Sequence, residues 1–212
     1  MIGCVAALAM LLCAMYSLGY FNTQEIYDVE KHPDAFGSIF TGRLVNNVMD
    51  GEGEIVYKNG DRYTGGFVNG EYHGAGSFNA ASGWSFEGLF LHGLPYGRGV
   101  FTDENGGVFE GYFEAGKIHG EGEFISSAGW IYDGEWDQGR QTGEGVFKYV
   151  DGSIYSGGFQ DGAASGTGTY TDAAGWSYTG GFLQGLFEGE GTLTFANGES
   201  TTGNWAAGIL IV

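Results

Sequence analysis

A 23-residue unit is repeated through most of this chain without insertion or deletion. The complete units begin at seven aromatic residues: Phe40, Tyr63, Phe86, Phe109, Tyr132, Tyr155 and Tyr178. An eighth, truncated unit begins at Thr201. A fixed period of this length is typical of repeat architectures, in which each unit packs mainly on its neighbours. We therefore expect residues 40–212 to form one elongated repeat domain.

Within each unit, apolar or glycine positions alternate with polar ones, counting the initial aromatic residue as position 1. Position 3 is glycine in every unit. Position 5 is large and apolar: Leu44, Phe67, Phe90, Phe113, Trp136, Phe159, Phe182 and Trp205. This two-residue period is that of a half-buried strand.

Glycines at positions 8 and 12 are expected to bracket a turn, and positions 12, 14 and 16 to share one face of a second strand. Each unit is therefore interpreted as a β-hairpin in which aromatic rings lie against glycines. Neighbouring strands are about 4.8 Å apart, so eight units predict a twisted ribbon roughly 70 to 80 Å long.

The ends of the units alternate between two sequence types. Odd units end in pairs that are typical of type I′ turns: Asn59-Gly60, Asn105-Gly106, Asp151-Gly152 and Asn197-Gly198. Even units carry a glycine followed by Trp84, Trp130 or Trp176 instead. The true repeat is therefore interpreted as a pair of units, 46 residues long.

This pattern resembles the MORN repeat (membrane occupation and recognition nexus). The best matches are YTGGFVNGEYHGAGSF from Tyr63 and FEGYFEAGKIHGEGEF from Phe109, and the resemblance extends over residues 40 to about 208. It implies an all-β fold, an open single-layer twisted β-meander of stacked hairpins, and a non-enzymatic role in scaffolding, tethering or assembly. The family's link to lipid binding is not expected of these repeats, because the turn position that holds Lys117 is basic in only one other unit, at Arg140.

Residues 1–20 carry no charged side chain and no proline. As a helix with a rise of about 1.5 Å per residue they would reach roughly 30 Å, enough to cross a bilayer core. We interpret them as a transmembrane anchor; a cleaved signal peptide is the alternative, although a basic n-region and a good A-x-A site are missing. Residues 21–39 are read as an acidic connector. The chain is thus expected to be a single-pass membrane protein, with an organelle inner membrane such as the mitochondrial one favoured and its side of the membrane left open.

The net charge is -18, from 26 acidic and 8 basic residues. Nucleic acid is excluded as a partner, because its binding depends on Lys and Arg neutralising phosphates. A basic protein would be attracted to such a surface. The alternative is that the acidity only keeps a glycine-rich rod soluble.

No catalytic, cofactor-binding or metal-binding residue is expected, and the chain is interpreted as a non-enzyme. The many G-x-G segments stand at strand positions and lack the Lys-Ser/Thr of a phosphate loop. His73 and His119 occupy the same position two units apart, about 20 Å by strand spacing, which is too far for one metal ion.

The candidate partner contacts are Trp84, Trp130, Trp176, Glu87, Glu110, Asp133, Ile209 and Ile211. The tryptophans either point outward as anchors at about 20 Å spacing or cover the rings of the ribbon itself. The three carboxylates form a solvated ladder, and the two isoleucines belong to an apolar tail at a sheet edge that invites pairing with a partner or a second copy.

The sequence thus predicts a non-catalytic, membrane-anchored scaffold or accessory subunit that braces the other protein subunits of a membrane complex. The alternative is a module that binds a glycan, peptide or lipid on the aromatic face of the ribbon.

Overall fold

The computed structural model describes residues 25–211, and within this range the chain forms seventeen strands and no helix. The strands are β1 (Ile26–Pro33), β2 (Ile39–Val45), β3 (Val48–Val56), β4 (Arg62–Val68), β5 (Glu71–Asn79), β6 (Ser85–Leu91), β7 (Leu94–Thr102), β8 (Val108–Glu114), β9 (Lys117–Ile125), β10 (Ile131–Asp137), β11 (Arg140–Lys148), β12 (Ile154–Gln160), β13 (Ala163–Thr171), β14 (Ser177–Leu183), β15 (Leu186–Thr194), β16 (Ser200–Ala206) and β17 (Ile209–Ile211). The transmembrane anchor expected at residues 1–20 lies outside the described residues. Between residues 25 and 211 there is no helix that could cross a membrane.

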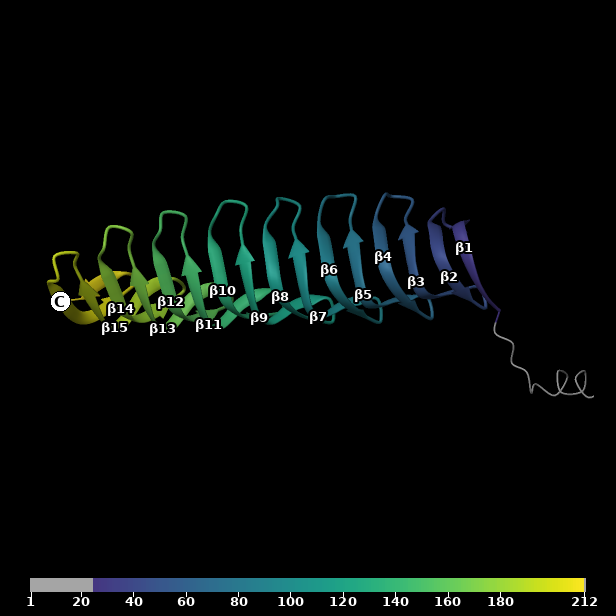
Figure 1. Cartoon of the computed structure of the whole chain (residues 1–212). Helices are drawn as coiled ribbons and strands as arrows, with labels where there is room; N and C mark the ends of the chain where they lie inside the picture. The colour runs from purple at the N-terminus through teal and green to yellow at the C-terminus, as the bar shows by residue number, and fades with distance from the viewer. Residues whose placement is uncertain (1–24, 212) are drawn as a thin grey trace, which may run out of the picture.

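Each strand pairs antiparallel with the strands that precede and follow it, so one sheet runs from β1 to β17 in chain order. Figure 1 shows these strands side by side as a long, twisted row with no second layer over it. The predicted open, single-layer meander is confirmed.

The sheet begins one strand before the first repeat unit. β1 lies within the segment interpreted as an acidic connector, and it pairs with β2 through contacts such as Tyr27 with Leu44. Tyr27 and Val29 pack against the core, whereas the acidic residues between and after them face solvent. The short alternation Tyr-Asp-Val-Glu therefore has the period of a half-buried strand.

The type I′ turns lie inside the units, at positions 7 and 8, rather than at the unit ends. In the second unit Asn69 and Gly70 have φ of 50° and 85°, and the flanking Val68 and Glu71 are paired. Both central residues of a type I′ turn need positive φ, and this two-residue turn meets that requirement.

The prediction of type I′ turns at the Asn-Gly pairs is wrong. At the end of the first unit only Gly60 has positive φ, of 97°. The Asn59 side-chain oxygen accepts a hydrogen bond from the N–H of Asp61. The Gly60 N–H donates to the Tyr57 carbonyl, and the Gly83 N–H makes the same bond to Ala80 in an even unit. Odd and even units therefore share one longer turn that needs a single left-handed glycine.

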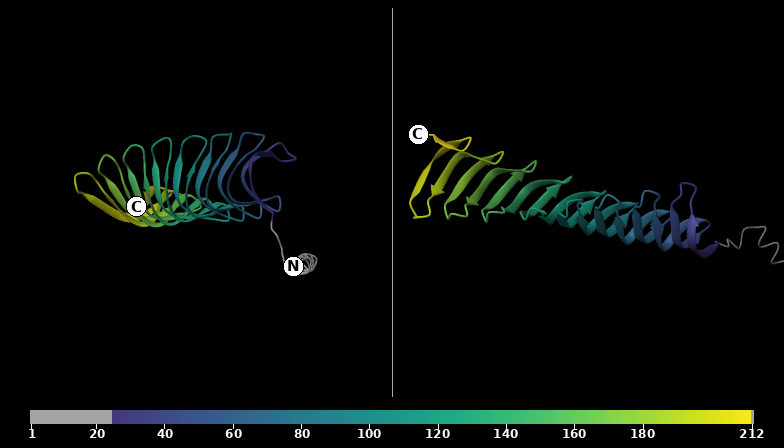
Figure 2. Two further views of the ribbon diagram at one scale, coloured as in Figure 1. Left: turned by 45° about the vertical axis from the view of Figure 1, so that its right-hand side comes forward. Right: turned by 90° about the horizontal axis from the view of Figure 1, so that it is seen from above.

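A glycine bulge bends the hairpin of every complete unit. In β4 and β5 the register shifts between Gly65 and Phe67, and Gly74 in the longer strand has φ of 71°. Such bulges kink a strand and increase its twist, and glycine adopts this conformation without a steric penalty. Because a bulge recurs in each complete unit, the sheet curls into the trough that is visible in Figure 2.

The core is one continuous row of rings at positions 1 and 5, called the inner row from here on. Tyr63 meets Phe67 of its own unit and Phe90 of the next, both at 5.1 Å between ring centroids and nearly perpendicular. The same edge-to-face contact links neighbouring rings from Phe40 to Trp205: Phe40, Phe67, Tyr63, Phe90, Phe86, Phe113, Phe109, Trp136, Tyr132, Phe159, Tyr155, Phe182, Tyr178 and Trp205. The predicted stacking of rings on glycines is confirmed, because a Cβ on Gly168 would lie 2.6 Å from the Tyr155 hydroxyl.

We expect Gly168→Ala to destabilise the protein by about 1–3 kcal/mol or more, because the added methyl group overpacks the space under Tyr155. Thr167→Ala, one residue earlier on the solvent side of β13, should change the free energy of unfolding by less than about 0.5 kcal/mol. Urea unfolding followed by far-ultraviolet circular dichroism measures both. Equal stability of the two variants would contradict the ring-on-glycine packing.

Candidate functional site

Tyrosine hydroxyls of the inner row are held by the backbone of their own units. The hydroxyl groups of Tyr63, Tyr132, Tyr155 and Tyr178 donate to the carbonyl at position 4, over 2.9, 3.0, 2.9 and 3.2 Å. Burial, with a smaller contribution from the Glu144 carboxylate, raises the pKa of Tyr155 to about 12. The inner row is thus a fixed floor for the trough.

Rings from the two ends of the hairpins meet over this floor, which makes the aromatic face the concave one. Tyr72 follows the type I′ turn and stacks on Tyr63, with 3.7 Å between centroids. Tyr57 lies in the turn at the opposite end of the strands, and its hydroxyl hydrogen bonds to that of Tyr72. A flat sheet would hold these two ends several residues apart.

An outer row of half-buried rings lines the concave face above the inner row, and the three predicted tryptophans belong to it. Trp84 stacks on Phe78 at 4.8 Å and Trp130 on Phe147 at 5.2 Å, while Trp176 tilts against Tyr170 at 5.3 Å. The tryptophans therefore cover other rings and still keep part of their surface in solvent. They do not form a stripe that projects freely outward.

In three of the four odd units a ring at position 18 takes the place of the tryptophan at position 22. These rings are Tyr57, Tyr149 and Phe195 in the first, fifth and seventh units. Tyr149 contacts Phe147 at 4.6 Å and Tyr170 at 5.9 Å, so it continues the outer row between the tryptophans. The alternation seen at the unit ends in the sequence is thus an alternation between position 18 and position 22 as the source of the ring. The outer row itself continues from one unit to the next.

The third unit, residues 86–108, interrupts the outer row. Its position 18 is Asp103 and its position 22 is Gly107, while Pro95 stands at position 10, where the second unit has Tyr72. A pocket of about 500 Å³ lies here, with Phe86 and Phe113 among its lining residues. Its other lining residues include Trp84, Leu94, Pro95, Phe101, Asp103 and Glu104. Sequence reasoning missed this pocket, although comparison of positions 18 and 22 across the units carries the signal.

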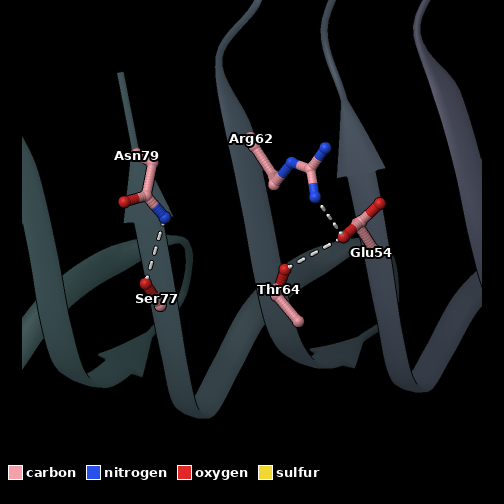
Figure 3. Close-up of polar contacts among 5 residues, drawn as sticks. All are labelled: Glu54, Arg62, Thr64, Ser77 and Asn79. Atoms are coloured by element: carbon pink, nitrogen blue, oxygen red, sulfur yellow. Dashed lines mark hydrogen bonds and ion pairs between the residues drawn. The ribbon is translucent and has the colours of Figure 1, made fainter. Parts of the chain in front are cut away.

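The convex face is polar and holds the three predicted carboxylates. Figure 3 shows its construction, with Arg62 and Thr64 of β4 meeting Glu54 of β3, at 3.0 Å for the Arg62–Glu54 ion pair. Glu87, Glu110 and Asp133 are exposed on this face. Glu110 forms an ion pair with Arg98 at 2.9 Å.

Like charges are directly paired on the convex face near the middle of the sheet. Glu123 of β9 lies opposite Glu110 of β8 on one side and Asp133 of β10 on the other. In the sixth and seventh units the same position is a threonine, and Thr169 and Thr192 hydrogen bond across the strands to Thr179 and Thr202. Like charges opposite each other destabilise a sheet, so this acidic row has a cost that the threonine units avoid.

The last predicted contacts lie at the C-terminal edge of the sheet. Ile209 and Ile211 of β17 are 69% and 57% exposed, while Leu210 between them points to the core. The tryptophans, carboxylates and isoleucines therefore fall on the concave face, the convex face and the edge, and the structure does not bring them into one site. Among residues 25–211, His, Cys, Asp and Glu form no group of three that could hold a metal ion.

We expect Tyr155→Phe to lower the free energy of unfolding by about 0.5–1.5 kcal/mol near neutral pH, through loss of the bond to the Gly158 carbonyl. The folded pKa is raised from 10.0 to about 12, so the stabilisation by the neutral hydroxyl is complete below pH 10 and is lost between pH 10 and 12. The deficit of the variant should therefore shrink in this range. Urea titrations across it measure the deficit, with exposed Tyr112→Phe as control; a deficit independent of pH would contradict the assignment.

We expect Glu123→Thr to raise the free energy of unfolding by about 0.2–1 kcal/mol at low salt, because it removes two like-charge pairs. The gain should decrease as added salt screens the exposed charges. Glu54→Thr is the matched control, since Glu54 occupies the same unit position but lies opposite Thr41 and Thr64 and forms an ion pair with Arg62, and it should bring no gain. Thermal unfolding at two salt concentrations tests both variants, and a gain from Glu54→Thr equal to that from Glu123→Thr would refute the repulsion.

Comparison with known proteins agrees with the repeat boundaries. The family model of the MORN repeat matches seven consecutive segments, residues 40–62, 63–85, 86–108, 109–131, 132–154, 155–177 and 178–200. No curated protein matches.

Two of the solved structures with similarity are TCP domains in complex with a segment of another protein. The SAS-4 (dCPAP) TCP domain of Drosophila melanogaster, in complex with a proline-rich motif of Ana2 (dSTIL), is 15% identical with a TM-score of 0.44, over 72% of this chain and 84% of that chain. The TCP10 domain of Danio rerio CPAP, in complex with a STIL peptide, is 13% identical with a TM-score of 0.32, over 86% and 100%. The family assignment rests on the seven matched segments, which make up more than half of the sequence, and this chain belongs to the MORN repeat family.

Proposed function

We propose that this protein is a non-catalytic scaffold that braces or assembles the protein subunits of a membrane complex. The observation that carries the proposal is the trough itself: a single sheet whose concave face presents half-buried rings along its length and whose convex face is acidic. Partly exposed aromatic side chains are the residues that most often anchor protein interfaces. The MORN family assignment supports a role in protein or membrane interaction.

The sheet is suited to this role because ring contacts hold each unit in a fixed orientation relative to the next unit. The edge-to-face contacts of the inner row, such as Tyr132 with Phe159 at 4.8 Å, cross from unit to unit without a break. Aromatic pairs of this geometry contribute about 0.5–1.5 kcal/mol beyond their burial. A partner that spans several units would therefore meet a preorganised surface and lose less entropy on binding.

Membrane attachment is part of the proposal and is assigned to residues 1–20, whose apolar composition motivates it. The proposed location is an organelle inner membrane. Partner contacts are assigned to the exposed parts of Trp84, Trp130 and Trp176, to the acidic ladder of the convex face, and to Ile209 and Ile211 at the free edge. The net charge of -18 favours partners with basic surfaces.

A second function, binding of a small ligand or peptide on the aromatic face, is favoured by one observation. The pocket of the third unit is concave and mostly apolar, with a few polar groups beside it, as ligand sites usually are.

Purification of the full chain in mild detergent, at low and at high salt, tests the scaffold proposal. We expect defined protein subunits to co-purify in fixed ratio at low salt and to dissociate in part at high salt, because screening weakens contacts between exposed charges. The chain should stay in the membrane after an alkaline wash. A lone monomer with no co-purifying subunit would overturn the scaffold proposal, and release by the wash would overturn the anchor.

A further inference from the structure

The third unit differs from the other six complete units in having no aromatic residue at either position 18 or position 22. All seven units lie within the described residues. In the first, fifth and seventh units the ring is Tyr57, Tyr149 or Phe195, and in the even units it is a tryptophan. The interruption therefore falls at a place where the rest of the chain consistently supplies a ring.

Position 10 of the third unit lacks the ring that the second and seventh units carry there, although Phe86 itself is buried. The remaining units are also non-aromatic at this position, with Met49, Ile118, Gln141 and Ala164. In the second unit Tyr72 stacks on Tyr63 at 3.7 Å, and in the seventh Phe187 stacks on Tyr178 at 3.8 Å. The corresponding residue of the third unit is Pro95, which lines the pocket together with Phe86. The pocket of about 500 Å³ thus occupies space that aromatic side chains fill elsewhere in the same sheet.

The walls of this pocket suit an aromatic guest. Trp84 stacks on Phe78 with one face and tilts against Phe101 at 6.0 Å, so the wall is held in place by the outer row. Leu94 and Pro95 supply aliphatic surface on the opposite side. Enclosed aromatic side chains of this kind are frequent hot spots of protein interfaces.

The pocket also carries negative charge. Asp103 and Glu104 are among its lining residues, which include no Lys or Arg. The Asp103 carboxylate accepts hydrogen bonds from the backbone N–H groups of Asn105 at 2.7 Å and Gly107 at 2.9 Å. These two bonds fix the position of the carboxylate. Among the ion pairs of the described residues, neither Asp103 nor Glu104 takes part. An unpaired carboxylate beside an apolar pocket favours a cation next to the guest ring.

We propose that this pocket receives an aromatic side chain of a partner protein, presented in a segment with Lys or Arg beside the aromatic residue. The proposal rests on the scaffold function and specifies where one partner is held. The chain's own residues 1–24 contain no Lys or Arg, and a second copy of a chain with net charge -18 is electrostatically disfavoured. A basic segment of another protein is therefore the occupant that fits both the shape and the charge.

Two substitutions fill the pocket with rings that the chain already uses at equivalent positions. Pro95→Tyr introduces the counterpart of Tyr72 without a change of charge, and Asp103→Tyr introduces the counterpart of Tyr57 and Tyr149. Gln141→Tyr is the matched control, because Gln141 stands at the position of Pro95 in another odd unit. Thermal unfolding confirms that each full-length variant is folded.

The probe is a fluorescein-labelled peptide with one tryptophan between pairs of Lys and Arg, measured by fluorescence anisotropy with the full chain in detergent. We expect Pro95→Tyr and Asp103→Tyr to weaken its binding about tenfold or more, and Gln141→Tyr to change it less than about twofold. A peptide with alanine in place of tryptophan should bind at least about tenfold more weakly to the unmodified chain, and so should one with glutamate in place of Lys and Arg.

No measurable binding of the tryptophan peptide, equal binding of the alanine peptide, or equal weakening by Gln141→Tyr and Pro95→Tyr would each overturn the pocket assignment. Co-purification of subunits with the Pro95→Tyr chain separates the two proposals. Subunits retained in full by this variant would refute the pocket while leaving the scaffold in place. Peptide binding as expected, with no subunit co-purifying with the unmodified chain, would refute the scaffold alone.

Discussion

The edge-to-face row of rings over glycines is the contact on which the whole sheet depends. A single-layer sheet has no second layer to cover its apolar face, so the rings must bury one another. Glycines at positions 3 and 14 make this possible, because a Cβ at either position would collide with the ring above it, as at Gly65 and Gly76 beneath Tyr63. The usual entropic cost of glycine in a strand is thereby offset by ring burial along the entire length.

Much of this architecture could be predicted from the sequence, because it follows from local alternation and a fixed period. The hairpins, their stacking and the rings on glycines all derive from residues a few positions apart. The turn type at Asn59-Gly60 could not be predicted, because an Asn-Gly pair fits loops of several lengths and the pairing of the flanking strands selects one. The pocket was missed for a related reason: Pro95 and Asp103 become neighbours only once the bulges have curled the sheet.

The two faces of the trough have different chemistry because a strand sends alternate residues to opposite sides. The concave face obtains its rigidity from rings, and its outer row departs from the regular pattern at the third unit. The convex face holds exposed charges, some of them in unfavourable rows such as Glu110, Glu123 and Asp133. A sheet selected for stability alone would use the threonine pairs of the later units there. An acidic surface of this kind attracts basic partners over long distances.

The interruption at the third unit also breaks a translational symmetry. In a trough of identical units, an extended partner could bind equally well after a shift by one unit or by two. Only a site that differs from its neighbours gives one alignment a lower energy than the others. The pocket between Trp84 and Asp103 is such a site, so it would fix the register in which a long partner binds along the sheet.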